Sequence, residues 1–276
     1  MTGGGTTTGA VRDALAAAAD ALAAAGVETP RLDAELLLAE ATGRDRAALA
    51  ADPEAGVDPA VARAFGDMVR RRVRREPVAY ILGRKGFRDI EVAVDPRALI
   101  PRPETELLVE VAVEHRSRAV LEIGTGSGAV ALAVADEVPG AEVTATDVSG
   151  PALEVARANA ARLGLAERVT ILHGSVPEGQ RFDLALANLP YVREDQWERL
   201  APEITRYEPR EALVAGPSGL EAIGRVVAAA PATVLALEVG AGQAAEAESL
   251  MRRAGYRDTE SRRDLAGVDR VVVGRR

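Results

Sequence analysis

The sequence predicts an α/β protein in which a mainly parallel sheet, covered by helices on both faces, follows a small all-helical domain. Three observations support this prediction. From residue 104 onward, strand-like segments alternate with helix-like segments, which is typical of parallel sheets. The first eighty residues instead show apolar side chains at helical spacing. A glycine-rich turn at residues 124 to 129 follows the first predicted strand, as in sheets that bind nucleosides.

The amino-terminal part predicts a disordered start and a helical domain. Residues 1 to 10 are rich in glycine and threonine, so we expect them to be disordered. Apolar residues recur at intervals of three or four in three stretches, at 11 to 22, 32 to 38 and 58 to 75. We therefore predict a helical domain over residues 11 to 84.

A run of arginines ends the third of these helices. The segment Arg70-Arg71-Arg72-Val73-Arg74-Arg75 places positive charge where it complements the helix dipole. Charge runs of this size are common on exposed helix faces, so we favour a solvated helix end. A docking patch for an acidic or RNA-associated partner is the alternative.

Two segments complete the predicted architecture. Residues 85 to 97 contain alternating apolar and polar side chains and predict a β-hairpin linker. Residues 98 to 276 predict the sheet domain, whose last two strands form an antiparallel pair. The strands are expected at 119–123, 142–146, 168–172, 182–187, 233–239, 256–262 and 268–274. The helices are expected at 104–115, 128–137, 151–163, 217–229 and 243–254.

The composition argues against several classes of protein. The chain of 276 residues has no cysteine and only two histidines, His115 and His173, so we expect no metal site. Its net charge of −8 argues against stable binding to nucleic acid. It has neither an apolar run of membrane-spanning length nor a signal peptide, which predicts a cytoplasmic protein that does not bind membranes.

The glycine-rich turn predicts a site for an adenosyl cofactor. A strand ending at Ile123 runs into Gly124-Thr125-Gly126-Ser127-Gly128-Ala129 and then into a helix. Glycines permit the tight turn and let a ligand lie against bare backbone. The predicted cofactor-binding residues in this turn are Gly124, Thr125, Gly126 and Gly128. The turn does not choose among cofactors, because it also fits the dinucleotide pattern G-x-G-x-x-G/A.

Two carboxylates flank this turn in the sequence. Asp147 ends the second predicted strand, 23 residues after Gly124, where a carboxylate can accept hydrogen bonds from both ribose hydroxyls. Glu122 precedes the glycines at the position where methyltransferases approach the cationic methionine end of their cofactor. We predict that both contribute to the cofactor site.

The segment Asn188-Leu189-Pro190-Tyr191 follows the fourth predicted strand, at the edge of the sheet where ligands bind. The Asn188 side-chain oxygen and the Leu189 carbonyl can each accept one N–H of a planar NH₂ group. This would hold the nitrogen in line with a methyl donor. Pro190 stiffens the turn, and Tyr191 offers a flat face for stacking. We predict Asn188, Pro190 and Tyr191 as catalytic residues and all four as substrate-binding residues.

Several further segments resemble one family, the bacterial methyltransferases that modify the glutamine of the Gly-Gly-Gln motif in peptide chain release factors. The resemblance covers nearly the whole chain. Its most specific segment is Leu99-Ile100-Pro101-Arg102-Pro103-Glu104-Thr105-Glu106, which generic methyltransferases lack. The other similar segments are Glu76 to Gly83, Tyr207 to Arg210, Gly216, Gly219-Leu220, Glu238-Val239-Gly240 with Gln243, Asp264 to Gly267, and Asp269-Arg270.

The resemblance implies a Rossmann-like class I methyltransferase with a seven-stranded mixed sheet and S-adenosylmethionine as cofactor. The implied substrate and partner is the release factor, which the helical domain would dock. Asn188 would contact the cofactor as well as the glutamine amide. Arg102 and Glu104 would bind near the cofactor's methionine end, although they could instead brace the domain junction.

One departure keeps a second function open. The family usually has proline where this chain has Leu189, and Asn-Leu-Pro-Tyr is the form found in ribosomal RNA adenine dimethyltransferases. The alternative is therefore an adenine N6-amino methyltransferase acting on RNA or DNA. The acidic net charge, the amino-terminal position of the helical domain and residues 99 to 106 favour the release factor.

Overall fold

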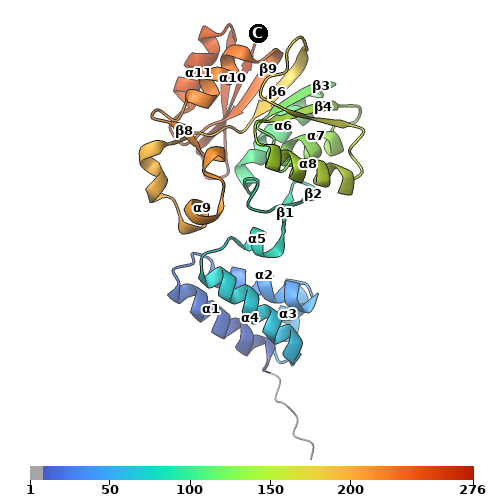
Figure 1. Ribbon diagram of the computed structural model, residues 1–276, viewed down its shortest axis with the longest axis vertical. Helices are drawn as coiled ribbons and strands as arrows, with labels where there is room; N and C mark the ends of the chain where they lie inside the picture. The colour runs from blue at the N-terminus through green and yellow to red at the C-terminus, as the bar shows by residue number, and fades with distance from the viewer. Residues whose placement is uncertain (1–8) are drawn as a thin grey trace, which may run out of the picture. The chain divides into compact units, whose positions relative to one another are not determined.

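A computed structural model describes residues 9–276, which form two compact units that divide after Gly83 (Figure 1). The disorder expected for residues 1 to 10 falls mainly on residues 1 to 8, which lie outside the described residues. None of the helices formed by residues 9–276 combines the length and apolar character that crossing a bilayer requires.

The first unit is helical, and its core follows the predicted apolar positions. Leu15, Leu22, Leu37 and Phe65 are buried in one cluster. Two short helices, of six and five residues, were not predicted, because so few residues give no repeating pattern. The helices are α1 (Val11–Ala24), α2 (Pro30–Thr42), α3 (Arg46–Ala51), α4 (Pro59–Val73) and α5 (Val78–Leu82).

The arginine run at the end of α4 is used largely within its own unit. The buried Arg72 donates from Nε to Asp33 Oδ2 of α2 at 2.7 Å. Arg71 pairs with Glu76, and Arg75 donates to backbone carbonyls at the end of α1. The solvated helix end favoured from the sequence is therefore wrong for Arg72, whose guanidinium is buried in an ion pair, whereas Arg70 and Arg74 are exposed.

The predicted hairpin is formed by β1 (Arg84–Phe87) and β2 (Ile90–Ala93), which pair antiparallel. It belongs to the second unit. The Asn159 side chain exchanges hydrogen bonds with both backbone groups of Ala93, which ties β2 to the neighbouring helix α8 (Gly150–Arg162). Asn159 is fully buried, so this contact fixes the hairpin on the sheet domain.

The larger sheet has seven strands among the described residues and is mixed, as predicted (Figure 1). Its order is β10-β11-β9-β6-β3-β4-β5, with the antiparallel pair β10–β11 at one edge. The strands are β3 (Ala119–Ile123), β4 (Glu142–Asp147), β5 (Val169–His173), β6 (Phe182–Ala187), β9 (Ala232–Glu238), β10 (Asp258–Arg263) and β11 (Asp269–Arg275).

Helices cover both faces of this sheet, and alternation along β3 shows which face each helix takes. Ile123 joins the core beneath α10 and α11, whereas Glu122 accepts a hydrogen bond from Ala131 of α7 on the other face. The central strands are therefore buried on both sides, which explains the apolar runs in β3, β6 and β9. The covering helices are α6 (Glu106–His115), α7 (Ala129–Glu137), α8, α10 (Glu221–Ala229) and α11 (Ala244–Arg253).

Residues 192–216 form an irregular segment between β6 and α10 for which the sequence predicted no element. Arg210 stacks over the Trp197 ring at 5.6 Å, and β7 pairs with β8. The segment comprises β7 (Val192–Arg193), the 3₁₀ helix η2 (Glu194–Arg199), α9 (Pro202–Tyr207), η3 (Arg210–Ala212) and β8 (Val214–Gly216).

Candidate active site

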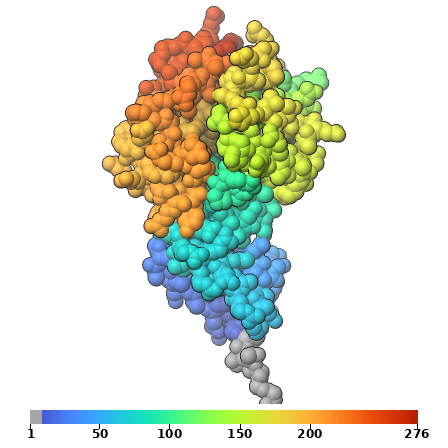
Figure 2. All heavy atoms as spheres, viewed as in Figure 1, coloured from blue at the N-terminus to red at the C-terminus, as the bar shows by residue number. Residues whose placement is uncertain are grey.

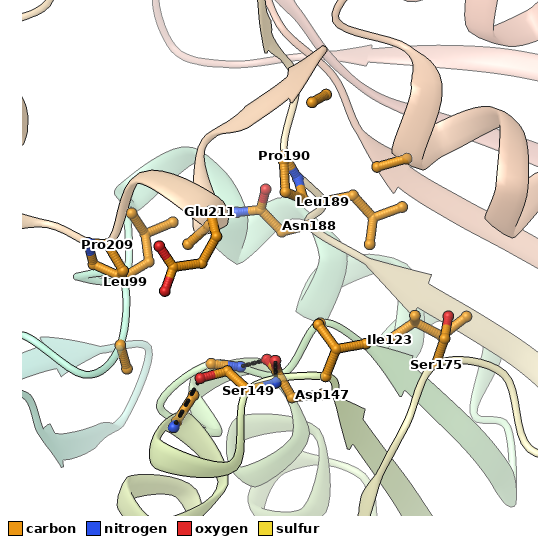
Figure 3. A pocket seen from close by; sticks show the side chains of 18 of the residues that line it. Leu99, Ile123, Asp147, Ser149, Ser175, Asn188, Leu189, Pro190, Pro209 and Glu211 are labelled. Atoms are coloured by element: carbon orange, nitrogen blue, oxygen red, sulfur yellow. Dashed lines mark hydrogen bonds between the residues drawn. The ribbon is translucent and has the colours of Figure 1, made fainter. Parts of the chain in front are cut away.

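A cavity of about 420 Å³ opens at the carboxyl ends of the parallel strands, within the second unit. The strand order reverses between β3 and β6, which is where ligands bind in open α/β sheets. In Figure 2 the surface is hollowed between the orange segment that contains α10 and the green segment that contains α8. Figure 3 shows Asn188 and Glu211 facing Asp147 and Ser149 across this cavity.

Two of the predicted glycines line the cavity, and one has another role. Gly124 and Gly126 form its wall, with φ of +79° and +55°. A Cβ at Gly126 would meet no protein atom within 4 Å, so it would project into open space beside the cavity. Gly128 does not belong to the lining. A Cβ there would lie 3.3 Å from Ala156 Cβ, so this glycine serves the packing of α7 against α8.

Asp147 lies where the sequence predicted a partner for ribose hydroxyls. It ends β4, lines the cavity, and accepts hydrogen bonds from the backbone N–H groups of Gly126 and Ser149, both at 2.8 Å. These two bonds fix the carboxylate. Each of its oxygens keeps a further acceptor position, because a carboxylate has about four in total.

Glu122 and Thr125 are buried behind the turn and do not belong to the lining. Glu122 Oε2 accepts from the Thr125 hydroxyl and, at 2.9 Å, from the Ala131 backbone N–H at the start of α7. Burial raises the pKa of Glu122 to about 8. The carboxyl group therefore braces the glycine turn in this structure, and direct contact of either residue with a cofactor remains a prediction.

Asn188 is held from behind by two buried side chains. Its Nδ2 donates to Thr105 Oγ1 at 3.0 Å, and the Thr105 hydroxyl donates to Glu238 Oε2 at 2.6 Å. Thr105 and Glu238 are 4% and 1% exposed. Asn188 lines the cavity and lies close to Gly124. A Cβ added at Gly124 would lie 3.3 Å from the Asn188 carbonyl oxygen.

Leu189 and Pro190 also line the cavity. The Leu189 side chain is buried in the apolar core with residues of α10. Leucine therefore packs well at this position, where the family usually has proline. Its carbonyl is the group that the proposed amide contact requires. The structure therefore accommodates the departure from the family pattern at this position.

Tyr191 is not part of the cavity lining, and its position is fixed by residues late in the chain. Its hydroxyl donates to Glu238 Oε1 at 3.3 Å, and its carbonyl accepts from Gln243 Nε2 at 3.0 Å. Burial and the neighbouring Glu238 raise the pKa of the Tyr191 hydroxyl above its ordinary value. Gly219 leaves room for the Tyr191 carbonyl, which a Cβ would approach to 2.6 Å.

Arg102 and Glu104 lie outside the lining as well. Arg102 forms an ion pair with the buried Glu208, which also accepts from the Ile100 backbone N–H at 3.2 Å. The segments around residues 100 and 208, both similar to the family, thus meet beside the cavity residues Leu99 and Pro209. Arg102 braces this wall, and contact of either predicted residue with the methionine end stays a prediction.

Thr105, Glu238, Gln243 and Glu208 were not predicted as site residues. Each lies in a segment that resembles the family, and that was the available signal. The resemblance assigned these four residues no role, whereas the structure gives each one a hydrogen bond to a residue at or beside the cavity.

The mixed sheet and the glycine turn beneath the cavity define a class I methyltransferase fold. A family model described as "Methyltransferase domain" matches residues 120–207. A solved structure of the hMettl16 catalytic domain in complex with MAT2A 3'UTR hairpin 6 has a TM-score of 0.59. It is 16% identical, covering 76% of this chain and 82% of that one, so the likeness extends to the fold alone.

More similar relatives define the family. A model described as "PrmC N-terminal domain" matches residues 13–83. The release factor glutamine methyltransferase of Bordetella pertussis is 45% identical over 89% of this chain and 94% of its own length. That of Caulobacter vibrioides is 40% identical over 94% and 93%. The chain belongs to the release factor glutamine methyltransferase family.

Proposed function

We propose that this enzyme transfers a methyl group from S-adenosylmethionine to the side-chain amide nitrogen of the glutamine in the Gly-Gly-Gln motif of peptide chain release factors. One observation carries the proposal: Asn188, Leu189 and Pro190 line the same cavity as Gly126 and Asp147. The residues proposed for the amide clamp and those proposed for the nucleoside site therefore line one cavity.

The residues present fit the cofactor. Asp147 offers acceptor positions for ribose hydroxyls, and the bare backbone of Gly124 and Gly126 permits a close approach. The cavity volume lies in the range of small-molecule sites. When bound, S-adenosylmethionine supplies an electrophilic methyl group, whose S–C bonding pair stays with sulfur as the amide nitrogen forms the new C–N bond and releases one proton to water.

The chain's own contribution is orientation. The Asn188 NH₂ group is committed to Thr105, which leaves Oδ1 to accept one N–H of the glutamine amide. The Leu189 carbonyl accepts the other. These two bonds hold the nitrogen toward the methyl donor and reduce its conjugation with its own carbonyl. The proton becomes acidic only as the bond forms, so catalysis needs positioning more than a strong base.

We further propose that the helical unit, residues 9–83, docks the release factor and that the enzyme works in the cytoplasm. The family model that covers residues 13–83 supports a role particular to this family. The second unit contains the whole cavity, which leaves the first unit available for a protein partner.

The test is incubation with labelled S-adenosylmethionine and, separately, purified release factor and ribosomal RNA. We expect label in the release factor only, at the glutamine identified by mass spectrometry. Label confined to the RNA would contradict the proposal in favour of an adenine methyltransferase.

The variant Asn188→Ala connects the activity to the clamp. It should reduce transfer below detection while retaining most affinity for S-adenosylhomocysteine, since Asp147 and the glycine turn are unchanged. Calorimetric titration of the variant with S-adenosylhomocysteine provides the control. Normal turnover by this variant would refute the amide-clamp mechanism.

A further inference from the structure

The hydrogen bonds behind Asn188 have a fixed direction. An ionised Glu238 can only accept, so the single hydroxyl hydrogen of Thr105 is used at 2.6 Å. The Thr105 oxygen is then left as an acceptor. Of the two ends of the Asn188 amide, the NH₂ group is the one that can donate to it. Because Thr105 has one hydroxyl hydrogen and Glu238 takes it, the Asn188 NH₂ group faces Thr105 and its Oδ1 points away.

The sheet register explains why these side chains meet. Ala187 of β6 pairs with Leu237 of β9, so Asn188 and Glu238 follow as neighbours at the ends of adjacent parallel strands. Ala187 and Leu237 belong to the apolar core beneath α10, and their successors point to the opposite face. Thr105, at the end of η1 (Pro103–Thr105), lies between the two polar side chains on that face.

We propose that Thr105 and Glu238 are positioning residues that set the polarity of the Asn188 amide, so that its oxygen and not its NH₂ group faces the acceptor. The identity of the acceptor as a glutamine NH₂ group rests on the proposed function. A reversed Asn188 would direct its own N–H groups at those of the acceptor, and the clamp would not form.

The ionisation state of Glu238 controls this polarity. A protonated Glu238 can donate to Thr105, which frees the Thr105 hydrogen to donate to Asn188 Oδ1 and stabilises the reversed amide. Glu238 is faced by Glu104 of η1, by Tyr191 after β6 and by Arg270 of β11. Burial raises its pKa to about 7, with a further contribution from Glu104. The oxygen-forward state is therefore enforced when Glu238 is ionised, above about pH 7, whereas at lower pH the reversed state can also form.

Nuclear magnetic resonance tests this directly on the full-length protein. Asn159 and Asn188 are the only two asparagines in the chain, so ¹⁵N-asparagine labelling yields two side-chain NH₂ signals. The Asn188 signal, assigned by its loss in Asn188→Asp, should shift with pH between about 6 and 8. Asn159 bonds to Ala93 and Ser127 instead and serves as the internal control for folding.

Three variants define the expected result. Thr105→Val removes the hydroxyl at nearly constant shape and should abolish the pH shift of Asn188, whereas Thr105→Ser should retain it. Glu238→Gln removes the titrating group and should also abolish the shift. An Asn188 signal that titrates unchanged in Thr105→Val and Glu238→Gln would overturn the proposal.

Kinetics on the release factor supplies the second measurement. Thr105→Val should lower kcat by about tenfold or more, with KM and affinity for S-adenosylhomocysteine within about twofold of wild type, and Thr105→Ser should restore kcat. The acid side of the wild-type kcat profile should disappear in Glu238→Gln. A parallel loss of S-adenosylhomocysteine affinity in Thr105→Val would assign Thr105 to the cofactor site instead. Because the resonance measurement needs no turnover, absence of methyl transfer by the wild type would refute the proposed function alone.

Discussion

A substitution of Gly126 gives a clear test at the scale of one residue, because both its backbone conformation and its position beside the cavity favour glycine. Its φ of +55° disfavours any side chain, and a Cβ would project into open space beside the cavity. Gly126→Ala should therefore weaken S-adenosylhomocysteine binding by about tenfold or more, measured by calorimetric titration. Gly164→Ala is the matched control, because Gly164 has φ of +71°, meets nothing within 4 Å and lies outside the lining. Equal affinities in the two variants would argue against Gly126 as a cofactor contact.

Glu122 connects the site to stability. Its pKa of about 8 in the folded protein lies above the ordinary value of 4.5, so folding takes up a proton between these values. The contribution of the raised Glu122 pKa to the free energy of unfolding is fully present below about pH 4.5 and is lost as the pH rises toward 8. Glu122→Gln removes this loss, so its unfolding free energy relative to wild type should increase from pH 5 to pH 8, by at most about 1.4 kcal/mol per pH unit.

Urea unfolding across this pH range measures the effect. Glu142→Gln, which removes an exposed carboxylate from β4, controls for the change in net charge. A constant difference between Glu122→Gln and wild type at every pH would contradict the prediction.

At the residue scale, the sequence predicted residues at the ends of strands better than it predicted hydrogen bonds between distant side chains. Gly124, Gly126, Asp147 and Asn188 lie at the ends of predicted strands, and the sequence correctly placed them together at one edge of the sheet. The contact between Asn188 and Thr105 joins residues 83 positions apart, and that between Thr105 and Glu238 joins residues 133 apart. No local pattern encodes such contacts, because they depend on the register of β6 and β9 and on the path of η1.

Among the elements, the sheet could be predicted and the segment at residues 192–216 could not. The central strands β3, β6 and β9 show sustained apolar character, because helices cover both of their faces, and β3 and β6 match their predicted bounds. The segment at residues 192–216 consists of elements of six residues or fewer, held by contacts such as that of Arg210 with Trp197. Its conformation follows from tertiary contacts and has no periodic signal.

The loops after β8 and β9 give a prediction at the scale of elements, because they hold the turn after β6. Gln243 donates to the carbonyls of Tyr191 and Gly219 and accepts from the Gly240 backbone N–H. Gly219→Ala would bring a Cβ to 2.6 Å from the Tyr191 carbonyl oxygen, so the turn must shift. We expect kcat on the release factor to fall by about tenfold or more.

Gly242→Ala is the control for Gly219→Ala. Gly242 has φ of +84°, close to the +80° of Gly219, but a Cβ there meets nothing within 4 Å. Both variants carry similar backbone strain of about 1–2 kcal/mol. They differ in the contacts of the new Cβ, which at Gly219 would meet the Tyr191 carbonyl, Gln243 Nε2 and Arg193. Equal kcat values for the two variants would show that these contacts of the loop with Tyr191 and Gln243 do not matter for catalysis.

For the whole molecule, we expect the helical unit to dock the release factor and the second unit to carry out methyl transfer. The cavity lies entirely in residues 84–276, whereas the Asp33–Arg72 ion pair lies in the core of the helical unit with both side chains 7% exposed. Removing one partner of a buried pair costs about 3–5 kcal/mol, a large part of the stability of a small unit. Asp33→Ala should therefore lower kcat/KM for the intact release factor. It should leave kcat/KM for a short Gly-Gly-Gln peptide unchanged, since the peptide needs only the cavity.

Asp67→Ala supplies the matched control, because Asp67 pairs with Arg70 on the same unit while both side chains are more than 60% exposed. An exposed pair contributes about 0–1 kcal/mol, so this variant should methylate both substrates at wild-type rates. Kinetics with the two substrates, together with calorimetric unfolding of each variant, separates the two roles. If Asp33→Ala lowered kcat/KM for the peptide as much as for the intact release factor, the helical unit would be supporting the catalytic site and not docking the partner. A loss confined to the intact release factor requires that the docking surface and the amide clamp belong to different units of the chain.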